Sequence, residues 1–127
     1  MFVIHPRQRN EKMKIGIDIS QIVYQGTGVA NYTKNLVENL LKFDKKNEYV
    51  FFGSSLRQKA RLEDFVKQRV EAEARLFSLP PLLLEKLWNQ LHIWPIEKLI
   101  GKVDVLHSSD WLQPPTKAKK VTTIHDL

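Results

Sequence analysis

Three short segments carry the residue types best suited to binding or catalysis. In chain order they are Gly26-Thr27-Gly28, His107-Ser108 and His125-Asp126. A glycine segment that leads into a helix offers backbone amides and the positive end of the helix dipole to a phosphate or another polar acceptor. A neutral imidazole can donate a hydrogen bond to a hydroxyl group or stabilise charge that develops during a reaction. Which chemistry is possible depends on where the fold places the segments.

Each segment also has a purely structural interpretation. Glycines after a strand often serve only the geometry of a turn. A histidine at the end of a strand is more often a hydrogen-bonded structural residue than a catalytic one. Asp18 lies inside an apolar run and needs a partner if it is buried. A backbone amide or a lysine is the simpler partner, and the sharper hypothesis is that Asp18 orients the glycine segment.

The apolar patterns predict strands alternating with helices. The strands are expected at 13–20, 48–54, 74–80, 103–109 and 120–127, and the helices at 29–41, 56–71 and 81–100. The first helix has its apolar residues at Val29, Tyr32, Leu36, Val37, Leu40 and Leu41. Pro95 is expected to kink the last helix or split it in two. This alternation predicts an α/β fold with an open, doubly wound parallel sheet.

In such a sheet, ligands bind beyond the carboxyl ends of the strands, near the point where the strand order reverses. The three segments all follow predicted strands, so we expect them to converge on this edge. His125 ends the fifth strand and is the strongest candidate for function.

Two phosphate-binding motifs are excluded by the sequence. GTGVAN at 26–31 begins like the dinucleotide fingerprint, but Asn31 replaces its third glycine, and FFGSS at 51–55 has no acidic residue for a ribose. The P-loop pattern is absent. A more general loop for a phosphate or a polar acceptor group remains.

Length and composition indicate one ordinary globular domain. The chain has 127 residues, 43% hydrophobic and 27% charged, with no cysteine and a formal net charge of +6. Without cysteine there is neither a disulfide nor a thiolate metal site. The basic residues are scattered, so we expect a solvated surface rather than nucleic-acid binding. No run is long enough to span a membrane, and residues 1–12 resemble no secretory signal, so we expect a disordered extension before a cytosolic domain at 13–127.

The order of motifs resembles a known family. MKIGIDIS at 13–20, GTGVANYTKNLVENLL at 26–41, DVLHSS at 104–109 and VTTIHDL at 121–127 together resemble the N-terminal half of bacterial glycosyltransferases of family 4, the retaining group-1 type. The resemblance implies a Rossmann-like domain that faces a second one in the GT-B arrangement. One departure is Ala30, where a second glycine is common in the family.

The resemblance implies transfer of a sugar from a nucleotide-sugar donor to a hydroxyl acceptor, itself a sugar or lipid-linked, in cell-envelope polysaccharide biosynthesis, with no cofactor or metal. By resemblance, Gly26, Thr27, Gly28, His107 and Ser108 bind substrate, while His125 and Asp126 act in catalysis. The family's donor-binding C-terminal domain has no counterpart in this chain. We therefore expect a glycosyltransferase fragment, truncated after its fifth strand and inactive alone.

Two alternatives remain open at this point. The first is a stand-alone α/β module that uses the glycine segment to bind a phosphate-bearing ligand or to regulate a partner. In the second, the apolar run 81–100 and the basic surface attach the protein peripherally to the inner face of the cell membrane. Glu85, Asn89, Gln90 and Glu97 within that run favour a helix that covers the sheet.

Overall fold

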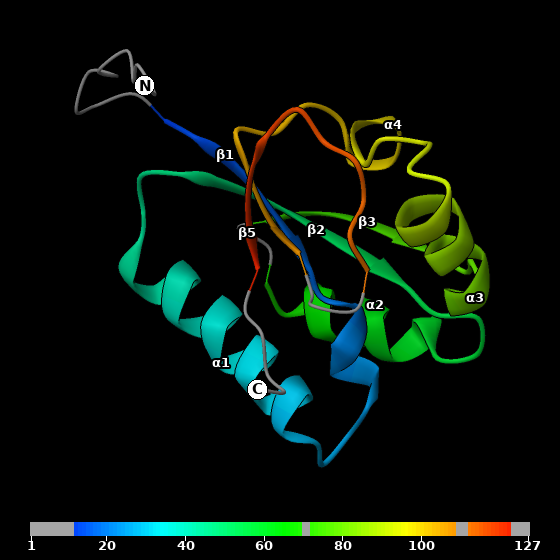
Figure 1. Cartoon of the computed structure of the whole chain (residues 1–127). Coiled ribbons are helices and arrows are strands. Elements are labelled where there is room, and N and C mark those ends of the chain that lie inside the picture. The colour runs from blue at the N-terminus through cyan, green and yellow to red at the C-terminus, as the bar shows by residue number, and fades with distance from the viewer. Residues whose placement is uncertain (1–11, 70–71, 109–111, 123–127) are drawn as a thin grey trace.

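The computed structural model describes residues 12–69, 72–108 and 112–122 (Figure 1). Its elements, in chain order, are β1 (Lys14–Asp18), the 3-10 helix η1 (Ser20–Val23), α1 (Gly28–Phe43), β2 (Glu48–Ser54), α2 (Lys59–Lys67), β3 (Glu73–Phe77), α3 (Pro81–Leu84), the π-helix η2 (Glu85–Gln90), α4 (Glu97–Ile100), β4 (Val105–Ser108) and β5 (Lys119–Thr122). The strands form one sheet in the order β3-β2-β1-β4-β5, and every neighbouring pair is parallel. The predicted α/β fold with an open parallel sheet is confirmed, and it is Rossmann-like.

Helices lie on both faces of this sheet, as Figure 1 shows. On one face, η1, α1 and α2 bury a core that includes Ile17, Val37, Phe51 and Leu62. On the other face, α3, η2 and α4 bury a second core around Phe52 and Trp88. A parallel sheet needs apolar cover on both faces, which explains why β2 is buried along nearly its whole length.

Gly16 allows α4 to approach β1 closely. A Cβ atom at this position would lie 3.0 Å from Cδ1 of Ile100 and 3.3 Å from Cδ1 of Leu106. Gly16 lies in the MKIGIDIS segment of the first strand, and close packing alone explains why a glycine stands at this position.

The predicted helix at 81–100 is divided into α3, η2 and α4. His92 and Trp94 have positive φ angles of 51° and 64°, which ends the helical path before Pro95. The amide of Ile93 donates to Leu87 O at 2.9 Å, and the indole of Trp88 donates to Trp94 O at 3.0 Å. The expected split is confirmed, but it begins before the proline.

Other boundaries differ from the predicted ones at the ends of elements. The helix expected at 56–71 forms only as α2, because Ser55 Oγ accepts a hydrogen bond from the amide of Gln58 and holds the preceding turn. The strand expected at 74–80 ends at Phe77, and the strand expected at 13–20 ends at Asp18, with Ser20 already in η1. Of the strand expected at 120–127, the part beyond Thr122 lies outside the described residues.

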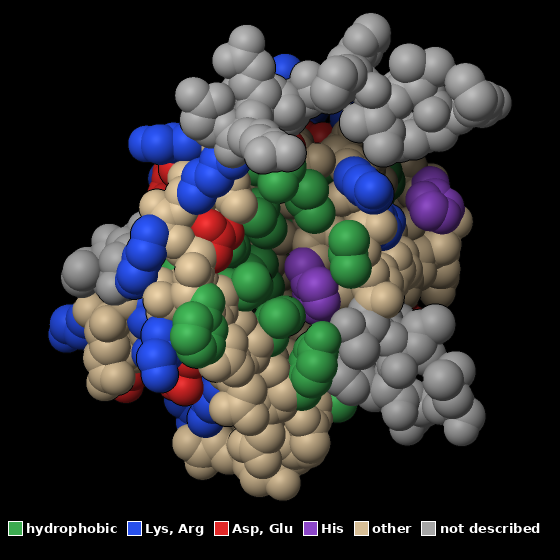
Figure 2. All heavy atoms as spheres, turned by 90° about the vertical axis from the view of Figure 1, so that its left-hand side faces the viewer, with side chains coloured by type: hydrophobic (Ala, Val, Ile, Leu, Met, Phe, Trp, Pro, Cys, Tyr) green, Lys and Arg blue, Asp and Glu red, His purple; other side chains and the backbone are tan. Residues whose placement is uncertain are grey.

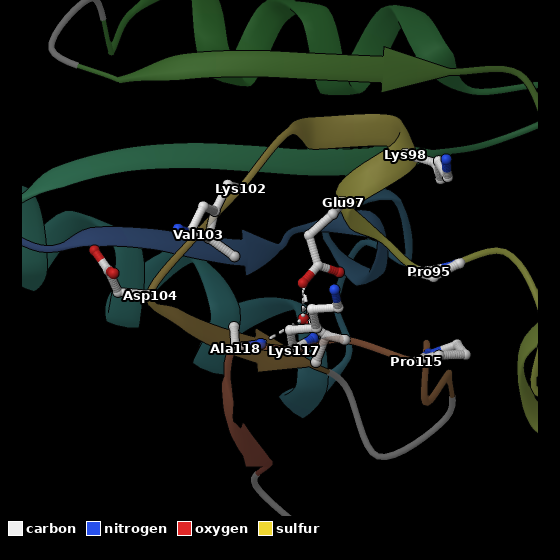
Figure 3. A pocket seen from close by; sticks show the side chains of 10 residues that line it. Pro95, Glu97, Lys98, Lys102, Val103, Asp104, Pro115, Lys117 and Ala118 are labelled. Carbon is white, nitrogen blue, oxygen red and sulfur yellow. Dashed lines mark hydrogen bonds between the residues drawn. The ribbon is translucent and has the colours of Figure 1, made fainter. Parts of the chain in front are cut away.

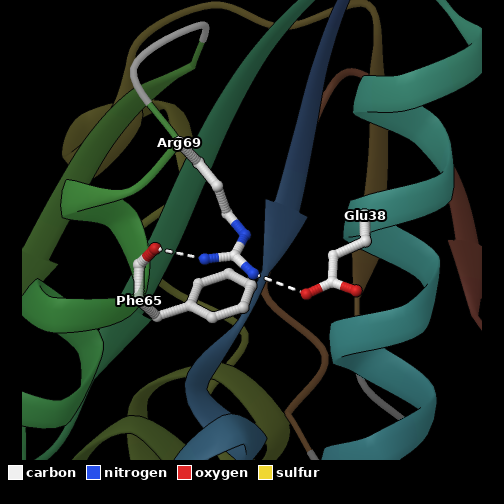
Figure 4. Close-up of polar contacts among 3 residues, drawn as sticks. All are labelled: Glu38, Phe65 and Arg69. Carbon is white, nitrogen blue, oxygen red and sulfur yellow. Dashed lines mark hydrogen bonds and ion pairs between the residues drawn. The ribbon is translucent and has the colours of Figure 1, made fainter.

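An arginine joins α1 to the end of α2 (Figure 4). The guanidinium of Arg69 donates to Glu38 Oε1 at 2.6 Å and to Phe65 O at 2.7 Å. It also lies over the Phe65 ring, 3.7 Å from the ring centroid. The planar guanidinium satisfies all three contacts at once, which fixes the two helices on the same face of the sheet.

The α1 face of the sheet is incompletely covered. Of the predicted apolar residues of α1, only Val37 and Leu41 are buried, and Tyr32 is 36% exposed. Val121 of β5 is 44% exposed on the same face. Figure 2 shows a band of hydrophobic side chains along this side of the molecule. Within the described residues, no helix is both long enough and apolar enough to cross a membrane.

Candidate functional site

The strand order reverses between β1 and β4. The chain proceeds from β1 outward to β2 and β3, then crosses to β4 on the other side of β1. Ile17 pairs with His107, so the carboxyl ends of β1 and β4 lie side by side. This is the position where open parallel sheets bind ligands.

The glycine segment follows β1 and η1 and begins α1. Gly26 has a φ of 80°, a left-handed conformation that favours glycine. Thr27 caps α1: its Oγ1 accepts a hydrogen bond from the amide of Ala30 at 3.1 Å and donates to Tyr24 O at 2.7 Å. Gly26, Thr27 and Gly28 are exposed to solvent.

Two amides at the start of α1 remain available to a ligand. Among the described residues, no hydrogen bond uses the amides of Gly28 or Val29. Gly28 is exposed and a Cβ atom there would meet nothing within 4 Å, while Val29 is half-buried. With the dipole of a 16-residue helix behind them, the two amides can bind an anionic oxygen.

Asp18 holds the end of β1 rather than the glycine segment. Its Oδ1 accepts a hydrogen bond from the amide of Ser20 at 2.9 Å. Ser20 Oγ in turn accepts from the amide of Ser54 at 3.0 Å, which ties the end of β1 to the end of β2. Burial raises the pKa of Asp18 above its usual value, although both Ser20 hydrogen bonds oppose this shift. The simpler expectation, a backbone amide as the partner of Asp18, is confirmed.

His107 and Ser108 point to opposite faces of the sheet. His107 is paired with Ile17 and lies on the α1 face, where it is half-buried. Ser108 faces the other side and is 1% exposed, and its Oγ lies 2.8 Å from Oγ1 of Thr122. The fold thus brings His107 and the glycine segment to the same edge and the same face, while Ser108 lies behind them.

His125 and Asp126, the two predicted catalytic residues, lie outside the described residues. Their roles stay predictions. Within residues 12–69, 72–108 and 112–122, no group of three or more His, Asp or Glu side chains could hold a metal ion.

One small cavity at the carboxyl edge is bordered by described residues. It has a volume of about 30 Å³ and is bordered by Ser20, Gln21, Tyr24, Ser54, Pro81, Leu84 and Leu112. A water molecule fits this space, whereas small-molecule sites usually enclose roughly 300–1,000 Å³. A ligand at the glycine segment would therefore lie outside this cavity.

A larger cavity lies at the opposite edge of the sheet, and sequence analysis missed it (Figure 3). Its volume is about 940 Å³, and residues 95–104 and 115–118 supply its walls. Lys98, Lys102 and Lys117 border it, together with Glu97 and Asp104. No motif could have indicated it, because two loops distant in sequence form it.

Both carboxylates that border this cavity accept hydrogen bonds from neighbouring segments of the chain. Glu97 Oε2 accepts hydrogen bonds from Thr116 Oγ1 and from the amide of Lys117, each at 2.8 Å. These bonds lower the pKa of Glu97 in spite of its partial burial. Asp104 Oδ2 accepts from the amide of Lys14 at 2.8 Å. The acidic groups thus shape the cavity, and the surrounding lysines are exposed.

The fold and the glycine segment define the class of this protein as a Rossmann-like α/β domain. Comparisons of the chain with protein-family models, with curated proteins and with solved structures found no significant match. Function therefore has to be argued from the motifs and from the geometry of the carboxyl edge.

Proposed function

We propose that this chain is the acceptor-side domain of a retaining glycosyltransferase that moves a sugar from a nucleotide-sugar donor to a hydroxyl acceptor. The observation that carries the proposal is the pair of amides at Gly28 and Val29, which make no hydrogen bond within the described residues and lie beside the reversal of strand order. The order of motifs that resembles family 4 glycosyltransferases supports the same assignment.

The chemistry of the reaction fits this edge. As the bond between the anomeric carbon and the phosphate oxygen breaks, negative charge accumulates on the leaving diphosphate. Amides and a helix dipole that already point at this position stabilise that charge without reorganising. His107, on the same edge and face, can hydrogen-bond a hydroxyl of the acceptor through its imidazole.

The small size of the cavity described at this edge is consistent with a two-domain enzyme. A nucleotide-sugar is far larger than the cavity of about 30 Å³ at this edge. In the GT-B arrangement, a second Rossmann-like domain supplies the opposite wall and binds most of the nucleotide. We propose that the glycine segment contributes one wall of such a cleft.

A transfer assay tests the proposal. The protein, produced from its complete gene, is incubated with a panel of nucleotide-sugars and with lipid and polysaccharide acceptors, and release of the nucleoside diphosphate is measured. We expect turnover with one donor, and we expect His125→Ala to lower it about 100-fold at an unchanged melting temperature. His92→Asn is the matched control, because His92 is exposed away from this edge and asparagine tolerates its positive φ.

The assay also separates the alternative function. A stand-alone phosphate-binding module would bind the nucleoside diphosphate but transfer no sugar from any donor. An unchanged turnover in His125→Ala, with a lowered melting temperature, would instead assign His125 a structural role.

A further inference from the structure

The large cavity at the amino edge of the sheet takes no part in the proposed transferase site. Its volume of about 940 Å³ lies within the range of roughly 300–1,000 Å³ that is usual for small-molecule sites. It lies where β4 and β5 begin, whereas the glycine segment lies beyond the carboxyl end of β1. The two places are at opposite ends of parallel strands, so the cavity needs its own explanation.

Hydrogen bonds fix the walls of this cavity. The amide of Ile96 donates to Pro115 O at 2.9 Å. The carboxylate of Glu97 extends from α4 toward the loop before β5, where it accepts hydrogen bonds from Thr116 Oγ1 and from the amide of Lys117 (Figure 3). These bonds join α4 to the loop at 115–118, so the cavity is already formed when a ligand arrives, as most small-molecule sites are.

Three lysines border the cavity without an anionic partner. Lys98, Lys102 and Lys117 are exposed, and none of them forms an ion pair with another described residue. Other basic side chains of the chain are paired: Arg69 with Glu38, for example. The three ammonium groups at the cavity therefore remain available to an anion.

The carboxylates at the cavity offer a ligand little to bind. Glu97 Oε2 is occupied by the loop, and Glu97 Oε1 is buried and accepts no hydrogen bond within the described residues. Asp104 Oδ2 accepts a hydrogen bond from the amide of Lys14. Because these oxygens are buried or already bonded, the exposed lysines are the charged groups that a ligand reaches. The cavity therefore favours an anion over a cation.

Apolar groups form much of the remaining wall. Pro95, Val103, Pro115 and Ala118 border the cavity, and all four have short or rigid side chains. A ring that packs against them removes apolar surface from water at little cost in side-chain entropy, because proline and alanine have almost no rotamers to lose. Cationic groups beside rigid apolar walls suit a ligand that has both an anionic group and a ring.

We infer that this cavity binds a phosphate monoester of a ring compound, either a nucleoside monophosphate or a sugar phosphate. Lys98, Lys102 and Lys117 bind the phosphate through charge-assisted hydrogen bonds. Pro95 and Pro115 pack against the ring. The inference uses none of the residues of the proposed transferase site, so its failure and the failure of the proposed function are distinguishable.

NMR titration of the 127-residue chain tests the inference. The probes are inorganic phosphate, glucose 6-phosphate and adenosine monophosphate. We expect at least one of the two ring compounds to shift the backbone amides of residues 96–104 and 116–118 and to bind at least about fivefold more tightly than inorganic phosphate. The tighter of the two identifies the ring as a sugar or a nucleoside.

Matched variants locate the binding. Lys98→Gln, Lys102→Gln and Lys117→Gln should each weaken binding about fivefold, because each removes a cation and keeps most of the side chain. Lys67→Gln removes an exposed lysine of α2 outside this cavity, and Gly28→Pro alters the glycine segment, so both should stay within about twofold of wild type.

Four results would each overturn the inference. They are no saturable binding of either ring compound, equal affinity for inorganic phosphate and both ring compounds, an equal loss of binding in Lys67→Gln, and shifts confined to Gly26–Val29.

Discussion

At the scale of single residues, the end of β1 depends on a buried carboxyl group. Asp18 is 4% exposed and accepts a hydrogen bond from the amide of Ser20. Because burial raises the pKa of Asp18 in the folded state, its ionisation lowers stability as pH rises above the unfolded value of about 3.9. The group thus serves as a hydrogen-bond acceptor, and its charge opposes folding.

Replacing Asp18 separates these two effects. Asp18→Asn keeps an acceptor for Ser20 and cannot ionise, so its melting temperature at neutral pH should equal or exceed that of the wild type. Asp18→Ala leaves the Ser20 amide without a partner and should lower the free energy of unfolding by about 1–3 kcal/mol. Thermal unfolding of both variants checks this, and a strong loss of stability in Asp18→Asn would show that the charge itself is needed.

The pKa of Asp44 is lowered, whereas that of Asp18 is raised, so ionisation of Asp44 stabilises the fold. Its carboxylate accepts hydrogen bonds from the Tyr49 hydroxyl at 2.5 Å and from Asn47 Nδ2 at 2.8 Å, which lowers its pKa to about 2. A lowered pKa contributes stability above the unfolded value, and this contribution disappears as pH falls through the folded value.

The stability difference between wild type and Asp44→Asn should therefore shrink as pH falls from about 5 to about 2. Chemical unfolding across this range, with Tyr49→Phe as a second variant that loses one donor, measures the effect. A difference that stays constant with pH would show that the carboxylate charge does not stabilise the fold.

At the scale of elements, sequence patterns predicted the presence of helices and strands more accurately than their boundaries. The predicted alternation of strands and helices was confirmed, because apolar periodicity follows directly from burial on a sheet or helix face, whereas η1 was not predicted. The split at His92 and Trp94 has no periodic signal, since it depends on hydrogen bonds from Trp88 and Ile93. Of the apolar positions predicted for α1, only Val37 and Leu41 are buried, so the sheet covers only part of this apolar stripe.

The contacts of Arg69 between α1 and α2 lead to a prediction about the stability of the fold. Arg69→Lys keeps the charge but loses the planar stacking on Phe65 and one of the two hydrogen bonds, so we expect it to lower stability by about 1 kcal/mol. Glu38→Gln should cost less, because the Glu38 side chain is 55% exposed and exposed ion pairs contribute little. Urea unfolding compares the two, and an equal or larger cost for Glu38→Gln would assign the stability to the ion pair instead.

At the scale of the whole molecule, the face of β4 and β5 that carries Val105 and Val121 is partly apolar, and it is incompletely covered within the described residues. Val121 is exposed there, and its register partner His107 is half-buried. A bare face of a parallel sheet favours association with other apolar surfaces. The 127-residue chain should therefore self-associate as its concentration rises.

Sedimentation velocity checks this expectation. Val121→Glu should shift the chain toward monomer, while Leu56→Glu, at a comparably exposed leucine outside this face, should not. A monodisperse monomer at every concentration would contradict it.

The sequence predicted the position of the glycine segment and of His107 at one edge of the sheet, because strand topology determines that position. The glycine segment and His107 follow adjacent parallel strands, and topology alone brings such segments to one edge. The availability of the Gly28 and Val29 amides depends on the Thr27 cap, and the large cavity depends on two distant loops, so neither follows from sequence patterns.

One substitution tests the site most directly, because it removes a single donor at little cost to the fold. Gly28 is the first residue of α1, its amide makes no hydrogen bond within the described residues, and Thr27 has the extended conformation that a following proline requires. Gly28→Pro therefore deletes one candidate anion-binding N–H, while Gly28→Ala retains it in equally open space.

The measurement is the dissociation constant of a nucleoside diphosphate, obtained by following backbone amide signals in an NMR titration. We predict shifts at Gly26–Val29 and at His107, about tenfold weaker binding in Gly28→Pro, and binding within about twofold of wild type in Gly28→Ala. Equal affinity in Gly28→Pro, or shifts confined to Lys98, Lys102 and Lys117 at the opposite edge, would contradict the assignment of the glycine segment as the binding site.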